Sequence, residues 1–433
     1  MLLEPRDFPE NFIFGSATAA YQIEGHQAGG AGETIWDHFA KNGGTFESQN
    51  GAVACDHYHR FEDDLDLLAE GGFDAYRFSF SWARLFPDGK NLNPEGLAFY
   101  DRLIDAMLER KLKPFATAYH WDMPQTLGAI GGWANREVVN HFGDFVGVVA
   151  KHFGERIESL ATINEPWCAS WLSHFIGEHA PGLQDITIAS KTMHNIMLAH
   201  GVGMAAARAE TAKPIGIVLN FTPGEAASDS DEDLQALALH EAISNEWFIS
   251  AAMRGEYPAV ALKVLEPYMP ENWQNDMDVI SAPIDFMGIN FYTSLKIKHQ
   301  QGDFPNIEVV TRELDTTDMG WEIEPAALGR VIKSVASYTG ELPLYITENG
   351  MAAVSGINDA DRISYFKSHT DVVAACAREY PLKGYFVWSL LDNFEWAFGY
   401  SKRFGIIHVD YDTQVRTPKD SYHWWKTGLT KRA

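Results

Sequence analysis

Short apolar runs recur along this 433-residue chain and alternate with longer segments in which apolar residues return every three or four positions. The runs are rich in β-branched and aromatic residues and are bounded by glycine, proline or polar residues. This pattern is typical of strands that are buried on both faces, as in a parallel sheet. We expect eight such strands, over residues 12–18, 75–80, 114–120, 159–164, 215–220, 286–290, 344–347 and 385–389.

The segments between these runs have the period of amphipathic helices. One of them follows Asn93–Pro94, a typical helix start, and carries its apolar residues on one face. Others end where glycine interrupts the pattern, at Gly71–Gly72 and at Gly340. Strands and helices are therefore expected to alternate along the whole chain.

Eight strand–helix units without a linker, a low-complexity tract or a short repeat favour an α/β fold, a single (β/α)8 TIM barrel with long βα loops. Residues 1–433 would then form one catalytic domain. A doubly wound sheet is the alternative, but it would need a glycine-rich phosphate loop directly after a strand. The glycine cluster at residues 29–32 lies instead in a long loop before Trp36.

Composition narrows the class of protein. The chain has 59 acidic and 34 basic residues, and its net charge of −25 argues against binding nucleic acid or an anionic membrane. Cys55, Cys168 and Cys376 are too few and too scattered for a disulfide framework or a zinc site, which indicates a reducing compartment. Neither a signal-peptide pattern nor a stretch of about 18 apolar residues occurs. We expect a cytoplasmic protein that acts on small molecules without a cofactor or metal; a homo-oligomer stays open.

Two of the expected strands deliver a glutamate. Residues 161–167 read ATINEPW and residues 344–350 read LYITENG, so Glu165 and Glu348 each follow an apolar run that proline or glycine stops. In a (β/α)8 barrel the chemistry takes place at the carboxyl ends of the strands. Two glutamates at this rim are the minimum for glycoside hydrolysis, which needs one acid/base and one nucleophile.

Other polar and aromatic residues fall near the same strand ends. They supply amide, guanidinium, imidazole, phenol and indole groups: Gln22, Arg77, His120, Trp121, Asn164, Asn220, Asn290, Tyr292 and Trp388. Sugar binding needs this mixture, because polar groups bind vicinal hydroxyls and aromatic rings pack on the C–H faces of a sugar. A metal site is disfavoured, since the histidines lack the short spacing of a helix-borne zinc site.

Six segments carry a resemblance to a known family. They read FPENFIFGSATAAYQIEG at 8–25, YRFSFSW at 76–82, YHWDMPQ at 119–125, TINEPW at 162–167, ITENG at 346–350 and WSLLDNFEW at 388–396. In this order and over nearly the whole chain, they closely resemble the family 1 glycoside hydrolases, which are β-glucosidase-like retaining enzymes. The resemblance implies the same barrel and the same reaction.

The resemblance also implies individual roles for the catalytic residues. Glu165 matches the family's general acid/base and Glu348 its nucleophile. Arg77 and Tyr292 match groups that surround the nucleophile. Asn164 matches the residue that binds the sugar 2-hydroxyl, a contact that strengthens in the transition state.

The remaining matches concern substrate binding. Gln22, His120, Glu395 and Trp396 match residues that hold the other hydroxyls of the non-reducing-end sugar, and Trp388 matches the platform under its ring. We also expect Trp121 and Asn290 to bind the substrate. Asn220 and Trp321 match positions on the side of the leaving group, the aglycone.

Two acid–base expectations follow from the neighbours of Glu165. Because Glu165 faces Glu348, it is expected to hold its proton near neutral pH. Cys168 lies three residues after Glu165 and is not expected to be a nucleophile, because a neighbouring carboxylate raises the pKa of a thiol.

The predicted function is a retaining, exo-acting β-glycosidase that releases glucose from β-glucosides or cello-oligosaccharides. Galactosides and fucosides stay open, because Glu395 and Gln22 suit an axial or an equatorial 4-hydroxyl. A 6-phospho-β-glycosidase is disfavoured, since the Glu395 carboxylate would repel a 6-phosphate. A non-catalytic sugar-binding scaffold is disfavoured because both catalytic glutamates are present.

Overall fold

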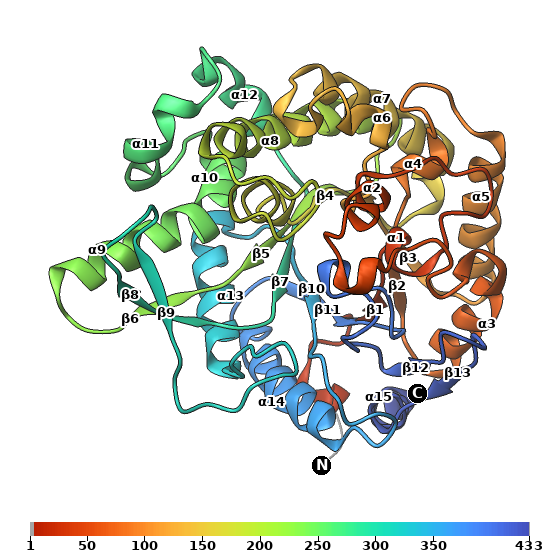
Figure 1. Cartoon of the computed structure of the whole chain (residues 1–433). Coiled ribbons are helices and arrows are strands. Elements are labelled where there is room, and N and C mark those ends of the chain that lie inside the picture. The colour runs from red at the N-terminus through yellow and green to blue at the C-terminus, as the bar shows by residue number, and fades with distance from the viewer. Residues whose placement is uncertain (1–3, 433) are drawn as a thin grey trace.

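The computed structural model describes residues 4–432, and its centre is a closed barrel of eight parallel strands (Figure 1). Around the barrel the strands follow the order β1-β11-β10-β7-β5-β4-β3-β2. Their bounds are β1 Ile13–Ala17, β2 Ala75–Ser79, β3 Lys113–Tyr119, β4 Ser159–Asn164, β5 Ile215–Phe221, β7 Phe286–Phe291, β10 Leu344–Asn349 and β11 Leu382–Trp388. The predicted TIM barrel is confirmed, and all eight predicted strands are present with shifts of a few residues at their ends.

Helices surround the barrel (Figure 1). The α-helices are α1 Ala20–Ile23, α2 Ile35–Lys41, α3 His57–Glu70, α4 Trp82–Leu85, α5 Pro94–Glu109, α6 Gln125–Gly128, α7 Glu137–Phe153, α8 Ile186–Arg208, α9 Asp231–His240, α10 Trp247–Arg254, α11 Ala259–Leu265, α12 Met277–Ile280, α13 Pro325–Thr339, α14 Ala360–Cys376 and α15 Asp420–Leu429. Two π-helical segments are η5 (Cys168–Ile176) and η6 (Glu241–Glu246). Within residues 4–432, every helix is too short or too polar to cross a membrane.

The predicted helix ends have a local cause. Helix α5 starts with Pro94, and the Asn93 side chain accepts a hydrogen bond from the backbone N–H of Glu95 at 3.1 Å. This cap satisfies one of the donors that a helix start leaves free. Helix α3 stops at Gly71, and α13 stops at Gly340, where φ is +58° and glycine is favoured.

Residues of the barrel strands are almost all buried, because helices cover the outside and side chains fill the inside. In β1 and β2 every residue is buried. Parallel pairing sets the register, and Arg77 on β2 pairs with Ala17 on β1 and with Phe115 on β3. Register thus fixes the height at which each strand presents its last polar side chain.

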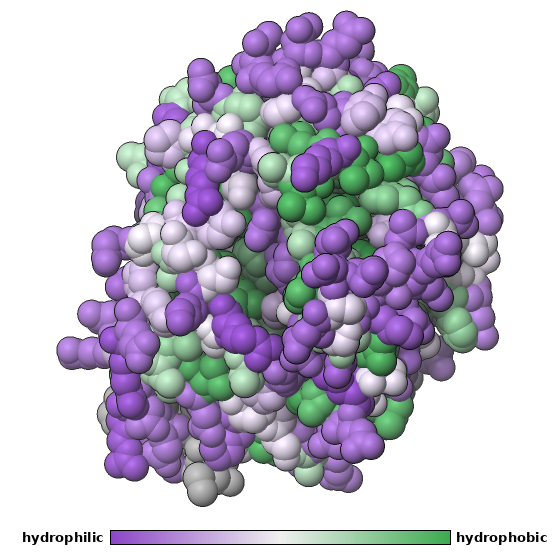
Figure 2. Space-filling view, turned by 90° about the vertical axis from the view of Figure 1, so that its left-hand side faces the viewer, coloured by the Kyte–Doolittle hydropathy of each residue, from purple (hydrophilic) through white to green (hydrophobic). Residues whose placement is uncertain are grey.

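Two small sheets lie outside the barrel and were not predicted. One joins β6 (Gly224–Ala226), β8 (Leu295–His299) and β9 (Ile307–Val310), and the other pairs β12 (Ile407–Val409) with β13 (Arg416–Pro418). The first sheet packs beside α9 at the left of Figure 1. Seen from that side, the surface is largely hydrophilic, and hydrophobic residues gather on one part of it (Figure 2).

Candidate active site

A cavity of about 360 Å³ holds both predicted catalytic glutamates at the carboxyl ends of the barrel strands. The predicted site residues on its wall are His120, Trp121, Glu165, Asn220, Asn290, Tyr292, Trp321, Glu348, Trp388, Glu395 and Trp396. Three further predicted residues, Gln22, Arg77 and Asn164, are buried and bonded to the residues around it. The fold therefore gathers the predicted site from all parts of the sequence.

Glu348, on β10, is held by two donors. Arg77 Nη1 donates to its Oε1 at 2.6 Å, and the Tyr292 hydroxyl donates to its Oε2 at 2.6 Å. Arg77 and Glu348 are only 2% and 3% exposed, so their charges attract each other away from water. The second arm of the guanidinium, Nη2, donates to Asn164 Oδ1 at 2.7 Å.

Glu165 is connected to the same network through Asn290. The Asn290 amide Nδ2 donates to Glu165 Oε1 at 2.6 Å and to Asn164 Oδ1 at 3.1 Å, while its Oδ1 accepts from the Thr347 hydroxyl at 2.7 Å. Both ends of the Asn290 amide are thus engaged within the protein. This geometry suits orienting Glu165 better than binding a sugar directly.

The environment of Glu165 raises its pKa to about 8. Burial is the largest cause, followed by the negative charge of Glu348, while hydrogen bonds from Asn290 and Cys168 act in the opposite direction. The carboxyl group is therefore protonated near neutral pH, as the sequence predicted. The backbone of Glu165 has φ of +50°, a left-handed conformation that is uncommon for residues other than glycine.

Three polar atoms around the inner end of the cavity are buried and have no partner within residues 4–432: Gln22 Oε1, His120 Nδ1 and Glu395 Oε2. The Gln22 amide nitrogen is fixed, because it donates to the Phe394 carbonyl at 2.8 Å. His120 Nε2 pairs with Asn164 Nδ2 at 3.2 Å, which leaves the proton of a neutral ring on Nδ1. Burial, together with Arg77, lowers the pKa of His120 well below its usual value. The inner end thus offers the Gln22 acceptor, the His120 donor and the Glu395 carboxyl group to the hydroxyls of a sugar.

Aromatic rings complete the inner wall. The rings of Trp388 and Trp396 stack roughly parallel to His120, with centroids 5.8 and 6.0 Å away. The Trp121 ring packs against His120 and Trp396, with centroids 4.9 and 4.6 Å away, and its Nε1 donates to the Asn164 carbonyl at 2.8 Å. Because that N–H is engaged, Trp121 presents only its ring to the cavity.

Asn220 and Trp321 line the cavity and are half-buried. The Trp321 ring lies 5.5 Å from the ring of Tyr292 and 6.2 Å from Phe404. Both residues are therefore available to a group that leaves the site. Within the described part of the chain, no group of three or more His, Cys, Asp and Glu side chains is arranged to hold a metal ion.

Comparison with known proteins agrees with this geometry. The family described as "Glycosyl hydrolase family 1" matches residues 4–432. The chain belongs to this family. Beta-glucosidase A of Thermotoga maritima is 44% identical over 433 residues, and the 1,4-beta-D-glucan glucohydrolase of Thermotoga neapolitana is 43% identical; each alignment covers 97% of both chains. A solved structure of the family 1 b-glucosidase from Thermotoga maritima superposes with a TM-score of 0.95 at 42% identity, covering 98% of both chains.

Some site residues of this family 1 chain were not singled out from the sequence. Thr347 holds the Asn290 amide, and Asn393 accepts a hydrogen bond from Gln22 Nε2 at 3.0 Å. Each lies within a family motif, next to or near a predicted residue, and that adjacency is the signal that could have identified it. Their partners are set by the three-dimensional fold.

Cys168 contacts the acid/base candidate directly. Its Sγ donates to Glu165 Oε2 at 3.1 Å, so both oxygens of Glu165 accept hydrogen bonds. Burial and the neighbouring Glu165 raise the pKa of the Cys168 thiol well above its usual value. The thiol is thus a poor nucleophile, as predicted, and its role is that of a hydrogen-bond donor.

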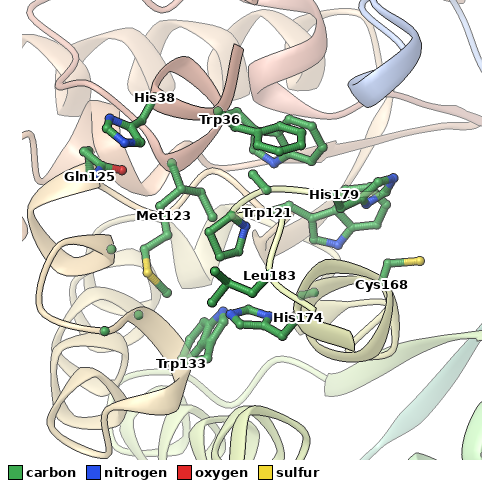
Figure 3. Close-up of a pocket in the computed structure, with 18 of the residues that line it drawn as sticks. Trp36, His38, Trp121, Met123, Gln125, Trp133, Cys168, His174, His179 and Leu183 are labelled. Atoms are coloured by element: carbon green, nitrogen blue, oxygen red, sulfur yellow. The ribbon is translucent and has the colours of Figure 1, made fainter. Parts of the chain in front are cut away.

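A second cavity, of about 290 Å³, lies on the other side of Trp121. Trp36, Trp121 and Trp133 reach it from α2, from the segment after β3 and from the turn at Gly132–Ala134 (Figure 3). It shares Trp121, Cys168 and His179 with the active-site cavity. Sequence analysis did not predict this cavity, because its walls come from segments far apart in the chain.

The hydrogen bond from Cys168 predicts a measurable change in Glu165. In Cys168→Ala the carboxylate form of Glu165 loses a donor, so the pKa of Glu165 should rise above its value of about 8. Cys168→Ser keeps a donor and should titrate close to the wild type. The test is a ¹³C NMR titration of protein labelled at the glutamate carboxyl groups, with Glu165→Gln identifying the signal. A pKa that falls in Cys168→Ala would contradict the donor role.

Proposed function

We propose that this family 1 chain is a retaining, exo-acting β-glucosidase, which releases glucose from the non-reducing end of β-glucosides and cello-oligosaccharides in one catalytic domain. The observation that carries the proposal is the contrast between two carboxyl groups in one cavity. Glu348 is paired with a buried guanidinium, whereas burial and Glu348 keep the pKa of Glu165 at about 8. One group is thus suited to attack and the other to donate a proton.

In the first step Glu348 attacks the anomeric carbon, and Glu165 protonates the glycosidic oxygen as it leaves. Arg77 and Tyr292 orient the attacking carboxylate through their hydrogen bonds to its two oxygens. A glucosyl ester on Glu348 results. Asn164, fixed by Arg77 and Asn290, is placed to bind the sugar 2-hydroxyl.

In the second step Glu165 becomes the general base. Ester formation removes the negative charge of Glu348, which is the second-largest cause of the raised pKa of Glu165. The pKa of Glu165 therefore falls in the intermediate, and its carboxylate takes a proton from the attacking water. Two displacements at one carbon retain the β-configuration.

Exo action follows from the closed inner end of the cavity. Gln22, His120 and Trp396 are at most 3% exposed, so no further sugar unit extends beyond them. The unpartnered polar atoms of Gln22, His120 and Glu395 are available to the hydroxyls of one terminal sugar, with Trp388 as the ring platform. The open side, with Asn220 and Trp321, receives the aglycone.

The names of the relatives support this substrate class. They include beta-glucosidases and a 1,4-beta-D-glucan glucohydrolase, and solved relatives are described in complex with isofagomine lactam and with deoxynojirimycin. A relative from Bifidobacterium breve, 40% identical, is named a bifunctional beta-D-glucosidase/beta-D-fucosidase. We therefore propose fucosidase activity as a second activity of the same site.

Glu348→Ala is expected to lower kcat by at least ~10⁴-fold on every glucoside, because no covalent intermediate forms. Azide occupies the space of the lost carboxylate and should restore turnover of an activated aryl glucoside. The product, identified by NMR, should be the α-glucosyl azide. A β-glucosyl azide from this variant would place the nucleophile elsewhere.

Glu165→Ala should respond differently. An activated leaving group needs little acid assistance, so the glucosyl enzyme should accumulate and give a burst of phenolate before slow hydrolysis. Unactivated glucosides should lose far more activity than activated ones, and azide should give the β-glucosyl azide. Equal losses on both kinds of substrate would exclude the acid/base role.

Trp321→Ala tests the aglycone side. Loss of ring stacking should weaken the transition state for cellobiose and aryl glucosides by about 1–3 kcal/mol in kcat/KM. Glucosyl fluoride has no aglycone ring and should be hydrolysed as by the wild type. A lower melting temperature with equal losses on all three substrates would instead make Trp321 a packing residue.

A further inference from the structure

A third cavity, of about 360 Å³, adjoins the active-site cavity on the aglycone side. The two cavities share a wall made of Trp167, Ile176, Asn220, Thr222 and Leu295. The side cavity continues away from this wall between η5, the α9–η6 segment and the β8–β9 pair. The part of a substrate that extends from the catalytic glutamates past Asn220 therefore reaches the entrance of the side cavity.

The far walls of the side cavity are apolar. Trp171 and Phe175 stack with their centroids 4.2 Å apart on η5. Further apolar side chains of the lining are Leu239, Ile243, Pro305 and Ile307. Apolar walls of this kind bind a ligand by removing its hydrocarbon surface from water.

The polar side chains of the far walls, His240 and Ser244, have partners within the protein, whereas Trp167 Nε1 on the shared wall is buried without a partner among the described residues. His240 Nε2 pairs with the Thr222 carbonyl at 2.8 Å, and the Ser244 hydroxyl lies 3.5 Å from His240 Nδ1. The Thr222 backbone N–H donates to Asn245 Oδ1 at 2.8 Å. A further sugar unit needs several free hydrogen-bond partners for its hydroxyls, and these far walls do not supply them.

We infer that the side cavity takes the apolar tail of an aglycone, so that the enzyme favours glucosides of long-chain alcohols over those of short ones. This inference rests on the proposed β-glucosidase activity and names a substrate class for it. The sugar and its glycosidic oxygen stay at Glu165 and Glu348, and the alkyl group of the aglycone passes Asn220 into the side cavity. Leu239 is then a specificity-determining residue remote from the reacting atoms.

The expected effect follows from the hydrophobic surface removed from water. Each methylene that enters the side cavity should raise kcat/KM by up to about fourfold, since burying one is worth about 0.8 kcal/mol. The first carbons of the alkyl group lie at the shared wall, and only later carbons enter the side cavity. The increase in kcat/KM should therefore continue as the alkyl group becomes longer. Methyl, butyl, hexyl and octyl β-glucosides, each below its micelle concentration, measure this slope.

Leu239→Gln, with Leu234→Gln as the matched control, tests the site. Leu239 is half-buried on the cavity wall, whereas Leu234 is 46% exposed on the same helix and does not line the cavity. The wild type and Leu234→Gln should prefer octyl over methyl glucoside by at least ~10-fold in kcat/KM. Leu239→Gln should reduce this ratio severalfold and leave methyl glucoside turnover unchanged. Ser244→Phe, which adds a ring to the cavity from η6 in the same α9–η6 segment, should reduce the ratio in the same way.

Two results would overturn the inference. One is a flat dependence on chain length in the wild type while methyl and nitrophenyl glucosides are hydrolysed, which leaves the β-glucosidase proposal intact. The other is an unchanged octyl-to-methyl ratio in Leu239→Gln and Ser244→Phe with a reduced cellotriose-to-cellobiose ratio, which would assign the cavity to a sugar. Absence of turnover with every glucoside contradicts the β-glucosidase proposal itself.

Discussion

The buried ion pair between Arg77 and Glu348 is the contact on which the rest of the site depends. Both side chains are almost fully shielded from water, and a buried charge that loses its partner typically costs about 3–5 kcal/mol. The Arg77 guanidinium is stabilised in this buried position because it donates hydrogen bonds to both Glu348 and Asn164. Asn164 in turn contacts His120, and it shares the Asn290 amide with Glu165. Four barrel strands, β2, β4, β7 and β10, are thus joined above the core by one hydrogen-bonded network.

The same pair explains how acid and base are distributed. Glu165, Glu348 and Glu395 lie around one cavity, and Arg77 pairs with Glu348 alone among them. Burial and mutual repulsion raise the pKa of Glu165 and of Glu395 to about 8. Glu165 and Glu395 are therefore largely protonated at neutral pH, whereas Glu348 is the glutamate that is paired with the cation. The surroundings, and not any difference in side-chain type, pair one glutamate with a cation and make the next a proton donor.

The barrel and most of the site could be predicted because their signals are local. Strands covered on both faces read as apolar runs, and a polar residue at a run's end is at the rim by topology. The β6–β8–β9 sheet was missed because its residues are half-exposed and lack a strong period. Asn290 was expected to bind substrate, yet both ends of its amide bond protein groups, since an amide's partners depend on neighbouring strands. The cavities beside the site are lined by distant segments and leave no pattern in the sequence.

Three residues around the active-site cavity have a left-handed backbone conformation, which lowers the stability of the fold. Trp121, Glu165 and Trp396 have φ values of +80°, +50° and +49°, and such conformations typically cost about 1–3 kcal/mol each in residues other than glycine. Glycine or asparagine would relieve this strain at any of the three positions. Selection of variants for heat resistance alone would therefore favour substitutions at these three active-site residues. A screen that is meant to retain them must measure catalytic turnover as well as stability.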